Sequence, residues 1–244
     1  SYAYNANGQM TSMTDVMGGV TSYTYDAVGN LSSTTDPGGH TTSYTYNANN
    51  ALSTVTDAAG GVTTYAYNAN GQVASISDAN GGTTSYGYDA NGNQTSVTDA
   101  EGNVTTYVYD ALNRVSSMED GEGNVTVYTY DAEGNQTSET DGEDYTQTMV
   151  YDDLGRLTQL VDKNGHTWSY GYDADGLQTS ATDPLNNTTT YAYDENGNLT
   201  SLTSPLGAAV TAVYDSMDRQ TSETNSRGYT TSYTYDNLGQ IIGV

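Results

Sequence analysis

The chain has 244 residues, of which 30 are acidic and five are Lys or Arg, and its net charge is −25. Nucleic-acid binding is excluded, because its affinity comes from basic side chains that neutralise phosphates. The charge instead favours solubility and loose attraction of cations. Cys and Phe are absent and Trp occurs once, so we expect tyrosine to supply the buried mass. No apolar run reaches the roughly 18 residues that a bilayer span needs, and no secretory signal is present.

A tyrosine followed by Asp or Asn recurs every 21 residues without insertion or deletion. A fixed period in this range is typical of repeat architectures, in which each unit needs only its neighbours. We therefore predict one continuous array over residues 1–244, about eleven and a half repeats long. Because the sequence starts and stops within a repeat, we expect it to be a window of a longer protein. The landmark tyrosines are Tyr4, Tyr25, Tyr46, Tyr67, Tyr88, Tyr109, Tyr130, Tyr151, Tyr172, Tyr193, Tyr214 and Tyr235.

The repeat that starts at Tyr88 shows the predicted structure of all the others. Residues 89–92 and 99–103 are rich in Asp, Asn and Gly and predict tight turns. Residues 94–98 and 104–109 are rich in β-branched side chains, repeat with period two and predict strands. The fold class is therefore all-β. We expect a long antiparallel β-strip that curls or spirals, because open sheets rarely stay flat beyond about ten strands. The alternative is a β-solenoid with one coil per repeat.

Most second strands end in a Tyr-x-Tyr pair whose two rings share one face of the sheet. Stacked repeats would align these rings in two ladders, with neighbouring Thr and Asn as partners for the hydroxyls. The predicted ladder residues are Tyr23, Tyr25, Tyr44, Tyr46, Tyr65, Tyr67, Tyr86, Tyr88, Tyr107, Tyr109, Tyr128, Tyr130, Tyr170, Tyr172, Tyr191 and Tyr193. The predicted turn glycines are Gly29, Gly71, Gly92, Gly134, Gly155, Gly176 and Gly197.

The first strand of each repeat adds a thinner apolar row. Polar residues interrupt this row at Thr34, Glu139 and Glu223, where we expect looser packing or contact with water. Met149 and Ala212 replace the first Tyr of a pair, Asp144 replaces a turn glycine, and Ser204 and Asn225 replace a turn Asp. We expect small local distortions at these positions, but no domain boundary. The row runs through Met13, Val55, Ile76, Val97, Met118, Leu160, Leu202 and Val244.

Three segments carry a resemblance to a known family: residues 109–115 (YDALNRV), 151–157 (YDDLGRL) and 235–241 (YDNLGQI). They resemble the YD repeat, also called the RHS repeat, of bacterial surface and toxin-carrier proteins and of animal teneurins. The resemblance implies a spiralling antiparallel strip that closes into a hollow shell around a C-terminal toxin. The Arg after the turn is kept here only as Arg114, Arg156 and Arg219. The unbroken register favours an open rod over a closed shell.

Some turns resemble the start of an oxygen-ligand calcium loop, with Asp89, Asn91, Asp173 and Asp175 as the candidate ligands. The bidentate Glu of such loops is missing, so a hairpin turn in which Asp binds backbone amides is the competing interpretation. The repeat consensus also generates Asn-x-Ser/Thr sequons, so Asn93, Asn103, Asn124 and Asn135 are candidate glycosylation sites.

No catalytic motif is present, and His40 and His166 lie six repeats apart. We therefore expect no enzyme activity and no required cofactor. The first functional hypothesis is a bacterial extracellular or cell-surface rod, stalk or filament that associates with itself or continues the array. The alternatives are a shell segment of an RHS-type toxin carrier, and an adhesion module that binds a glycan or a cell-surface protein.

Overall fold

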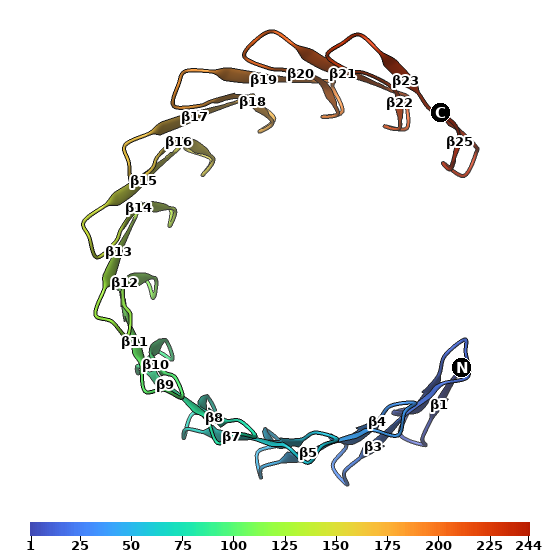
Figure 1. The fold of residues 1–244 in the computed structure, drawn as a ribbon, viewed down its shortest axis with the longest axis vertical. Helices are drawn as coiled ribbons and strands as arrows, with labels where there is room; N and C mark the ends of the chain where they lie inside the picture. Colours follow the sequence, from blue (N-terminus) through green and yellow to red (C-terminus); the bar gives the residue numbers. More distant parts are fainter. The chain divides into compact units, whose positions relative to one another are not determined.

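The computed structural model describes all 244 residues, and every regular element in it is a β-strand. The strands follow one another as hairpins, which can be followed by colour in Figure 1. The chain divides into two units, Ser1–Val125 and Thr126–Val244, and each is described by itself. No helix in the structure has the length and hydrophobicity that crossing a bilayer requires.

In the first unit, each strand from β1 to β12 pairs antiparallel with the next. The strands are β1 (Tyr2–Tyr4), β2 (Met10–Thr14), β3 (Val20–Tyr25), β4 (Leu31–Thr35), β5 (Thr41–Tyr46), β6 (Leu52–Thr56), β7 (Val62–Tyr67), β8 (Val73–Ser77), β9 (Thr83–Tyr88), β10 (Gln94–Thr98), β11 (Val104–Tyr109) and β12 (Val115–Glu119).

In the second unit the same pairing runs from β13 to β23, and β24 and β25 form a separate hairpin. The strands are β13 (Val125–Tyr130), β14 (Gln136–Thr140), β15 (Thr146–Tyr151), β16 (Leu157–Val161), β17 (Thr167–Tyr172), β18 (Gln178–Thr182), β19 (Thr188–Tyr193), β20 (Leu199–Thr203), β21 (Ala209–Tyr214), β22 (Gln220–Thr224), β23 (Thr230–Ser232), β24 (Thr234–Tyr235) and β25 (Ile241–Gly243).

These pairings confirm the predicted all-β fold of two short strands and two tight turns per repeat. The predicted ranges 94–98 and 104–109 coincide with β10 and β11. The solenoid alternative is wrong, because each strand pairs antiparallel with the strand that follows it in sequence and not with its copy in the next repeat. Tight turns explain this outcome, since a short loop can only return the chain beside the strand it has just left.

The two hairpins of a repeat differ in register. Across the Tyr-Asp turn, Tyr86 of β9 lies opposite Val97 of β10, and a bulge follows before Tyr88 meets Gln94. Across the other turn, Val97 lies opposite Thr105 without a bulge. Val97 is thus placed between a tyrosine and a threonine of its two neighbouring strands.

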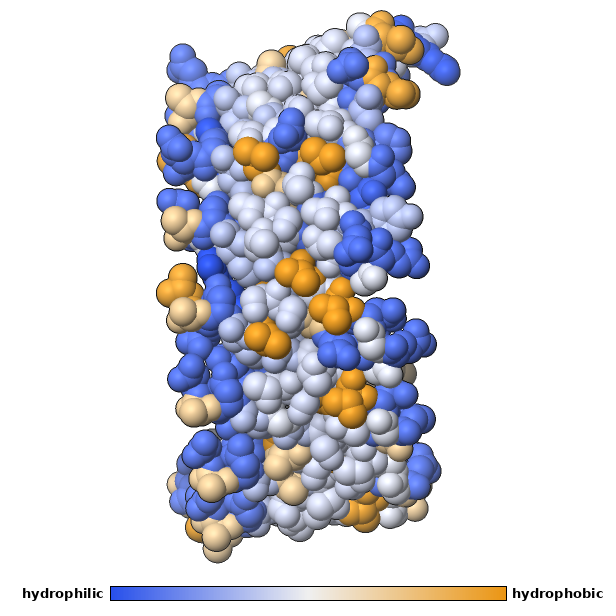
Figure 2. Space-filling model, turned by 90° about the vertical axis from the view of Figure 1, so that its left-hand side faces the viewer, coloured by the Kyte–Doolittle hydropathy of each residue, from blue (hydrophilic) through white to orange (hydrophobic).

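The sheet is a single layer without a core. No side chain is fully buried, and the exposed surface is 15,230 Å², whereas a compact protein of 25.8 kDa would expose about 10,500 Å². In the view of Figure 2, hydrophilic residues predominate along both margins, and hydrophobic residues form small separate spots, most of them between the margins and a few on them. Half-buried tyrosine and aliphatic side chains therefore replace a closed interior, as the composition predicts.

Candidate functional site

The turns are held by an aspartate that binds its own loop. In the turn after Tyr88, the Asp89 amide donates to the Asn93 carbonyl at 2.9 Å, and the Gly92 amide donates to the Asp89 carbonyl at 3.1 Å. The carboxylate oxygen Oδ1 of Asp89 accepts from the amides of Asn91 and Asn93 at 2.9 and 2.8 Å. One carboxylate therefore satisfies backbone donors that the short loop would otherwise leave unpaired.

Each such loop has one residue in the left-handed region, at the fourth position. All the predicted turn glycines lie there, for example Gly92 with φ of 92°. Asn91 does not share this conformation, so the loop is a three-residue hairpin with one left-handed position and not a two-residue Asn-Gly turn. Where glycine is missing, Asn or Asp takes the position, as in Asp144 with φ of 65°, because a short polar side chain tolerates it best.

Hydrogen bonds lower the pKa of many turn aspartates. For Asp99, the side-chain amide of Asn103 is the largest cause, and the backbone amides of Asn103 and Glu101 add to it. All three favour the charged carboxylate, so the pKa lies below its ordinary value. The same direction holds for Asp89 and Asp120.

The calcium candidates do not converge on one point. Asp89 directs both carboxylate oxygens at its own loop, with Oδ2 accepting from the Asn93 side chain at 2.9 Å. Asp173 uses Oδ1 for the amides of Asp175 and Leu177. The structure contains no group of three or more His, Asp or Glu side chains that could hold a metal ion. The geometry therefore favours the hairpin interpretation of these aspartates.

The sequon asparagines are part of the same turns. The side-chain nitrogens of Asn93, Asn103, Asn124 and Asn135 donate to the aspartate four residues earlier, at 2.9, 2.7, 2.9 and 2.9 Å. Asn93 also donates to Asn113 in the next repeat at 2.8 Å. The atom that would carry a glycan is thus engaged in the turn, and glycosylation stays a prediction.

The second tyrosine of each pair has a partner that sequence reasoning missed. Its hydroxyl donates to a backbone carbonyl 15 residues earlier, as from Tyr67 to Leu52 at 2.7 Å and from Tyr88 to Val73 at 2.9 Å. This carbonyl belongs to the first residue of the preceding strand, beyond the point where the two strands stop pairing. The same bond is made by Tyr25, Tyr46, Tyr109, Tyr172, Tyr193, Tyr214 and Tyr235.

The predicted ladders are built differently from stacked rings. Equivalent tyrosines lie two strands apart, about 10 Å, which is beyond the range of direct ring contact. The strand between them places a row residue in the gap, as Val97 does beside Tyr86. Tyrosine and aliphatic side chains therefore alternate along this face.

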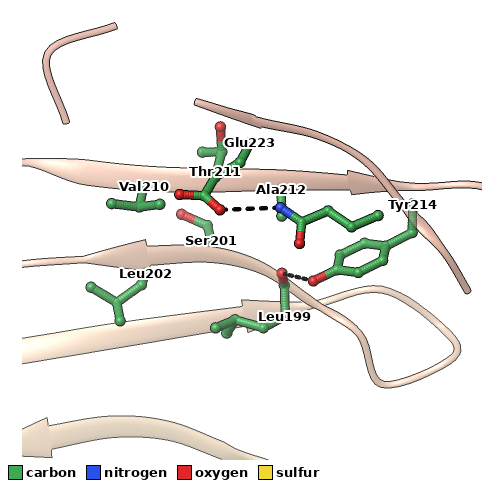
Figure 3. Close-up of a pocket in the computed structure, with 9 residues that line it drawn as sticks. Leu199, Ser201, Leu202, Val210, Thr211, Ala212, Tyr214 and Glu223 are labelled. Atoms are coloured by element: carbon green, nitrogen blue, oxygen red, sulfur yellow. Dashed lines mark hydrogen bonds between the residues drawn. The ribbon is translucent and has the colours of Figure 1, made fainter. Parts of the chain in front are cut away.

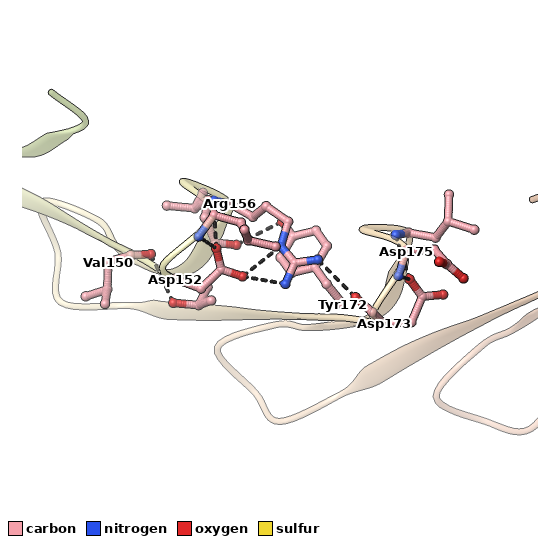
Figure 4. A network of polar contacts seen from close by, with 10 residues as sticks. Val150, Asp152, Arg156, Tyr172, Asp173 and Asp175 are labelled. Atoms are coloured by element: carbon pink, nitrogen blue, oxygen red, sulfur yellow. Dashed lines mark hydrogen bonds and ion pairs between the residues drawn. The ribbon is translucent and has the colours of Figure 1, made fainter. Parts of the chain in front are cut away.

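Two arginines, Arg156 and Arg219, tie one repeat to the next. Arg156 binds the Oδ2 atom of Asp152 through Nε and NH2, both at 2.7 Å, and donates to the carbonyl of Asp173 at 3.0 Å. Its guanidinium lies 4.7 Å from the ring centre of Tyr172 (Figure 4). Arg219 makes the same contacts with Asp215, Asp236 and Tyr235. These two arginines link the turns of successive repeats.

Lysine and histidine also pair with acidic side chains. Lys163 pairs with Glu139 and Asp141, both at 3.1 Å. His40 and His166 each contact the aspartate four residues earlier at 3.0 Å. The histidine contacts stay within one turn, whereas Lys163 joins its own turn to that of Asp141 in the preceding repeat.

The chain matches the family model "RHS Repeat" along most of its length. The matched ranges are residues 4–41, 25–63, 46–83, 67–104, 88–125, 109–146, 151–188, 172–209 and 214–244. A search among curated proteins gives no match.

Solved structures share the fold at low sequence identity. The crystal structure of TcdB2-TccC3-Cdc42 matches 99% of this chain, with a TM-score of 0.72 and 17% sequence identity. The crystal structure of TcdB2-TccC3 also matches 99% of this chain, with a TM-score of 0.68 and 18% sequence identity. A Tc holotoxin pore structure from Photorhabdus luminescens matches 98% of this chain, with a TM-score of 0.50 and 16% sequence identity. The chain spans only 15%, 16% and 18% of these chains.

Proposed function

This chain belongs to the RHS repeat family, and we propose on that premise that it is a wall segment of an RHS-type shell. In this proposal it is a non-catalytic part of a larger secreted or cell-surface bacterial protein, and the complete wall curls until it encloses a toxin polypeptide. Its partners are then the continuing repeat array and the enclosed chain.

The single-layer sheet is the observation that carries this proposal. A wall between an interior and the surrounding solution has two wet faces, and a sheet without a buried side chain is suited to that position. The turns keep their aspartates and asparagines at the margins, where they stabilise the loops without closing a core. The fold likeness to TcdB2-TccC3 over 99% of the chain supports the same assignment.

A rod or filament is the second candidate, because one observation favours it. The pairing register is the same in regular and irregular repeats, as the equivalent pairs Tyr107↔Met118 and Ala212↔Glu223 illustrate. A constant repeat gives a constant rise and rotation, which is the geometry of open helical assemblies. An adhesion module remains a third hypothesis, and a glycan array without hits would argue against its glycan-binding form.

Cryo-electron microscopy of the native protein that contains this chain tests the proposal. The shell function predicts closed, capped particles that hold additional protein density. Continuous open fibres without enclosed density would contradict it and support the rod.

A further inference from the structure

A hollow of about 300 Å³ opens in the second unit, on the face of the sheet that carries the paired tyrosines (Figure 3). It lies over β20, β21 and β22, and Leu199, Leu202, Val210, Ala212, Tyr214 and Glu223 are among the residues that line it. A volume of this size is at the small end of the range of ligand sites.

The hollow exists because a tyrosine is missing. Ala212 lies opposite Glu223 in the same register that places Tyr107 opposite Met118 and Tyr191 opposite Leu202. A phenol ring at residue 212 would therefore cover the floor that alanine leaves open. The neighbouring Tyr214 keeps its hydroxyl bond to the Leu199 carbonyl, at 3.1 Å.

The floor of the hollow is also more apolar than the equivalent surface of most other repeats. Val210 occupies a position that is Thr in most repeats, such as Thr105 and Thr189. It lies opposite Leu202, and Leu199 lies on the same preceding strand. An alanine in place of a tyrosine therefore uncovers aliphatic surface, which favours a ring in the vacant place.

The rim carries a negative charge. Glu223 Oε2 accepts from the side-chain amide of Gln220 at 3.2 Å. Glu139 occupies the equivalent position of an earlier repeat and forms an ion pair with Lys163 at 3.1 Å. A glutamate at this position therefore holds a basic group in one repeat, and we infer the same chemistry for a ligand at Glu223.

We propose that the hollow at Ala212 is a docking site for an aromatic side chain of a partner polypeptide, with a basic group next to the ring. The ring takes the place of the missing tyrosine on Leu199, Leu202 and Val210, and the basic group faces Glu223. The inference does not depend on whether the chain is part of a shell or of a rod.

Tyramine, a phenol ring with an amine, is the first probe, and p-cresol is the same ring without the charge. Titrated into the full chain up to about 20 mM, tyramine is expected to shift the NMR methyl signals of Leu202 and Val210 saturably. Glu223→Gln should weaken tyramine about threefold, as for a partly exposed ion pair, and leave p-cresol unchanged.

Ala212→Tyr restores the repeat residue and should abolish binding of both probes without unfolding the chain. Val213→Tyr is the matched control, because residue 213 points to the opposite face, and binding should persist. The peptide Gly-Lys-Tyr-Lys-Gly should displace tyramine, and Gly-Lys-Ala-Lys-Gly should not. The proposal is overturned if no saturable shift is seen, if Ala212→Tyr still binds, or if both peptides or neither displace the probe.

Discussion

The repeat around Asp99 and the repeat around Ser204 have the same backbone but differ in the side chains that support it. Asp99 accepts from the amides of Glu101 and Asn103 and from the Asn103 side chain. Ser204 accepts from the Ala208 amide alone, at 3.2 Å. Nevertheless both loops close with the same two backbone bonds, between the first residue and the fourth and fifth.

The strands next to these turns show the same contrast. Tyr86 faces Val97 in the regular region, and Ala212 faces Glu223 in the irregular one, with the same spacing in sequence. Backbone pairing and loop length therefore fix the register, while the side chains adjust how firmly each hairpin is held. A repeat protein can tolerate such local losses, because stability is approximately a sum over repeats and their interfaces.

The largest expected effect comes from making the regular region resemble the irregular one. Tyr86→Ala removes a half-buried ring above Val97 and should cost about 2 kcal/mol of unfolding free energy, below the range for a fully buried aromatic residue. Hydrogen exchange of β9 and β10 amides measures this loss. Ala212→Tyr should protect β21 and β22 instead, and a loss of protection in both variants would contradict the account.

The glycine position should give the next largest effect. Gly102→Val forces a β-branched residue to adopt φ near 88°, at a cost of about 1–2 kcal/mol. Asp144→Gly should stabilise its hairpin by a smaller amount, since Asp144 already adopts φ of 65° there. Thermal denaturation of the two variants checks the opposite signs, and equal shifts in one direction would show that the left-handed position is not limiting.

The tyrosine hydroxyl should contribute less. Tyr88→Phe loses the bond to the Val73 carbonyl and should cost about 1 kcal/mol. Tyr214→Phe should cost less, because its bond to Leu199 is longer, at 3.1 Å. Urea denaturation of these variants, with Tyr86→Phe as the control on the same strand, measures the difference. An equal cost for all three would show that the bond to the carbonyl is not what the hydroxyl contributes.

Acidification should produce the smallest difference, confined to individual turns. The lowered pKa of Asp99 means that its stabilising effect is fully present above the ordinary Asp value and is lost as pH falls through the folded value. Amide protection in the 99–103 turn should therefore decrease below about pH 4, while the Ser204 turn, which has no carboxylate at this position, should not respond. NMR exchange rates at pH 5 and pH 3 give the comparison, and parallel loss in both turns would indicate global unfolding.

The sequence was sufficient to predict most of the fold, because the repeat places every turn and strand at a fixed position. The ranges of β10 and β11 follow from turn residues and alternation alone. The bond from Tyr88 to Val73 could not be predicted, since it depends on where two strands stop pairing and not on residue type. The hollow at Ala212 was visible only as a lapse in the pattern, and its apolar floor required the register of three strands.

Small-angle X-ray scattering of the 244-residue chain tests the central claim most directly, because it measures the thickness of the sheet in solution. A single-layer wall predicts a thickness of one sheet with its side chains, about 10 Å. A thickness near twice that value would mean that two sheets pack face to face around a core, and it would contradict the account.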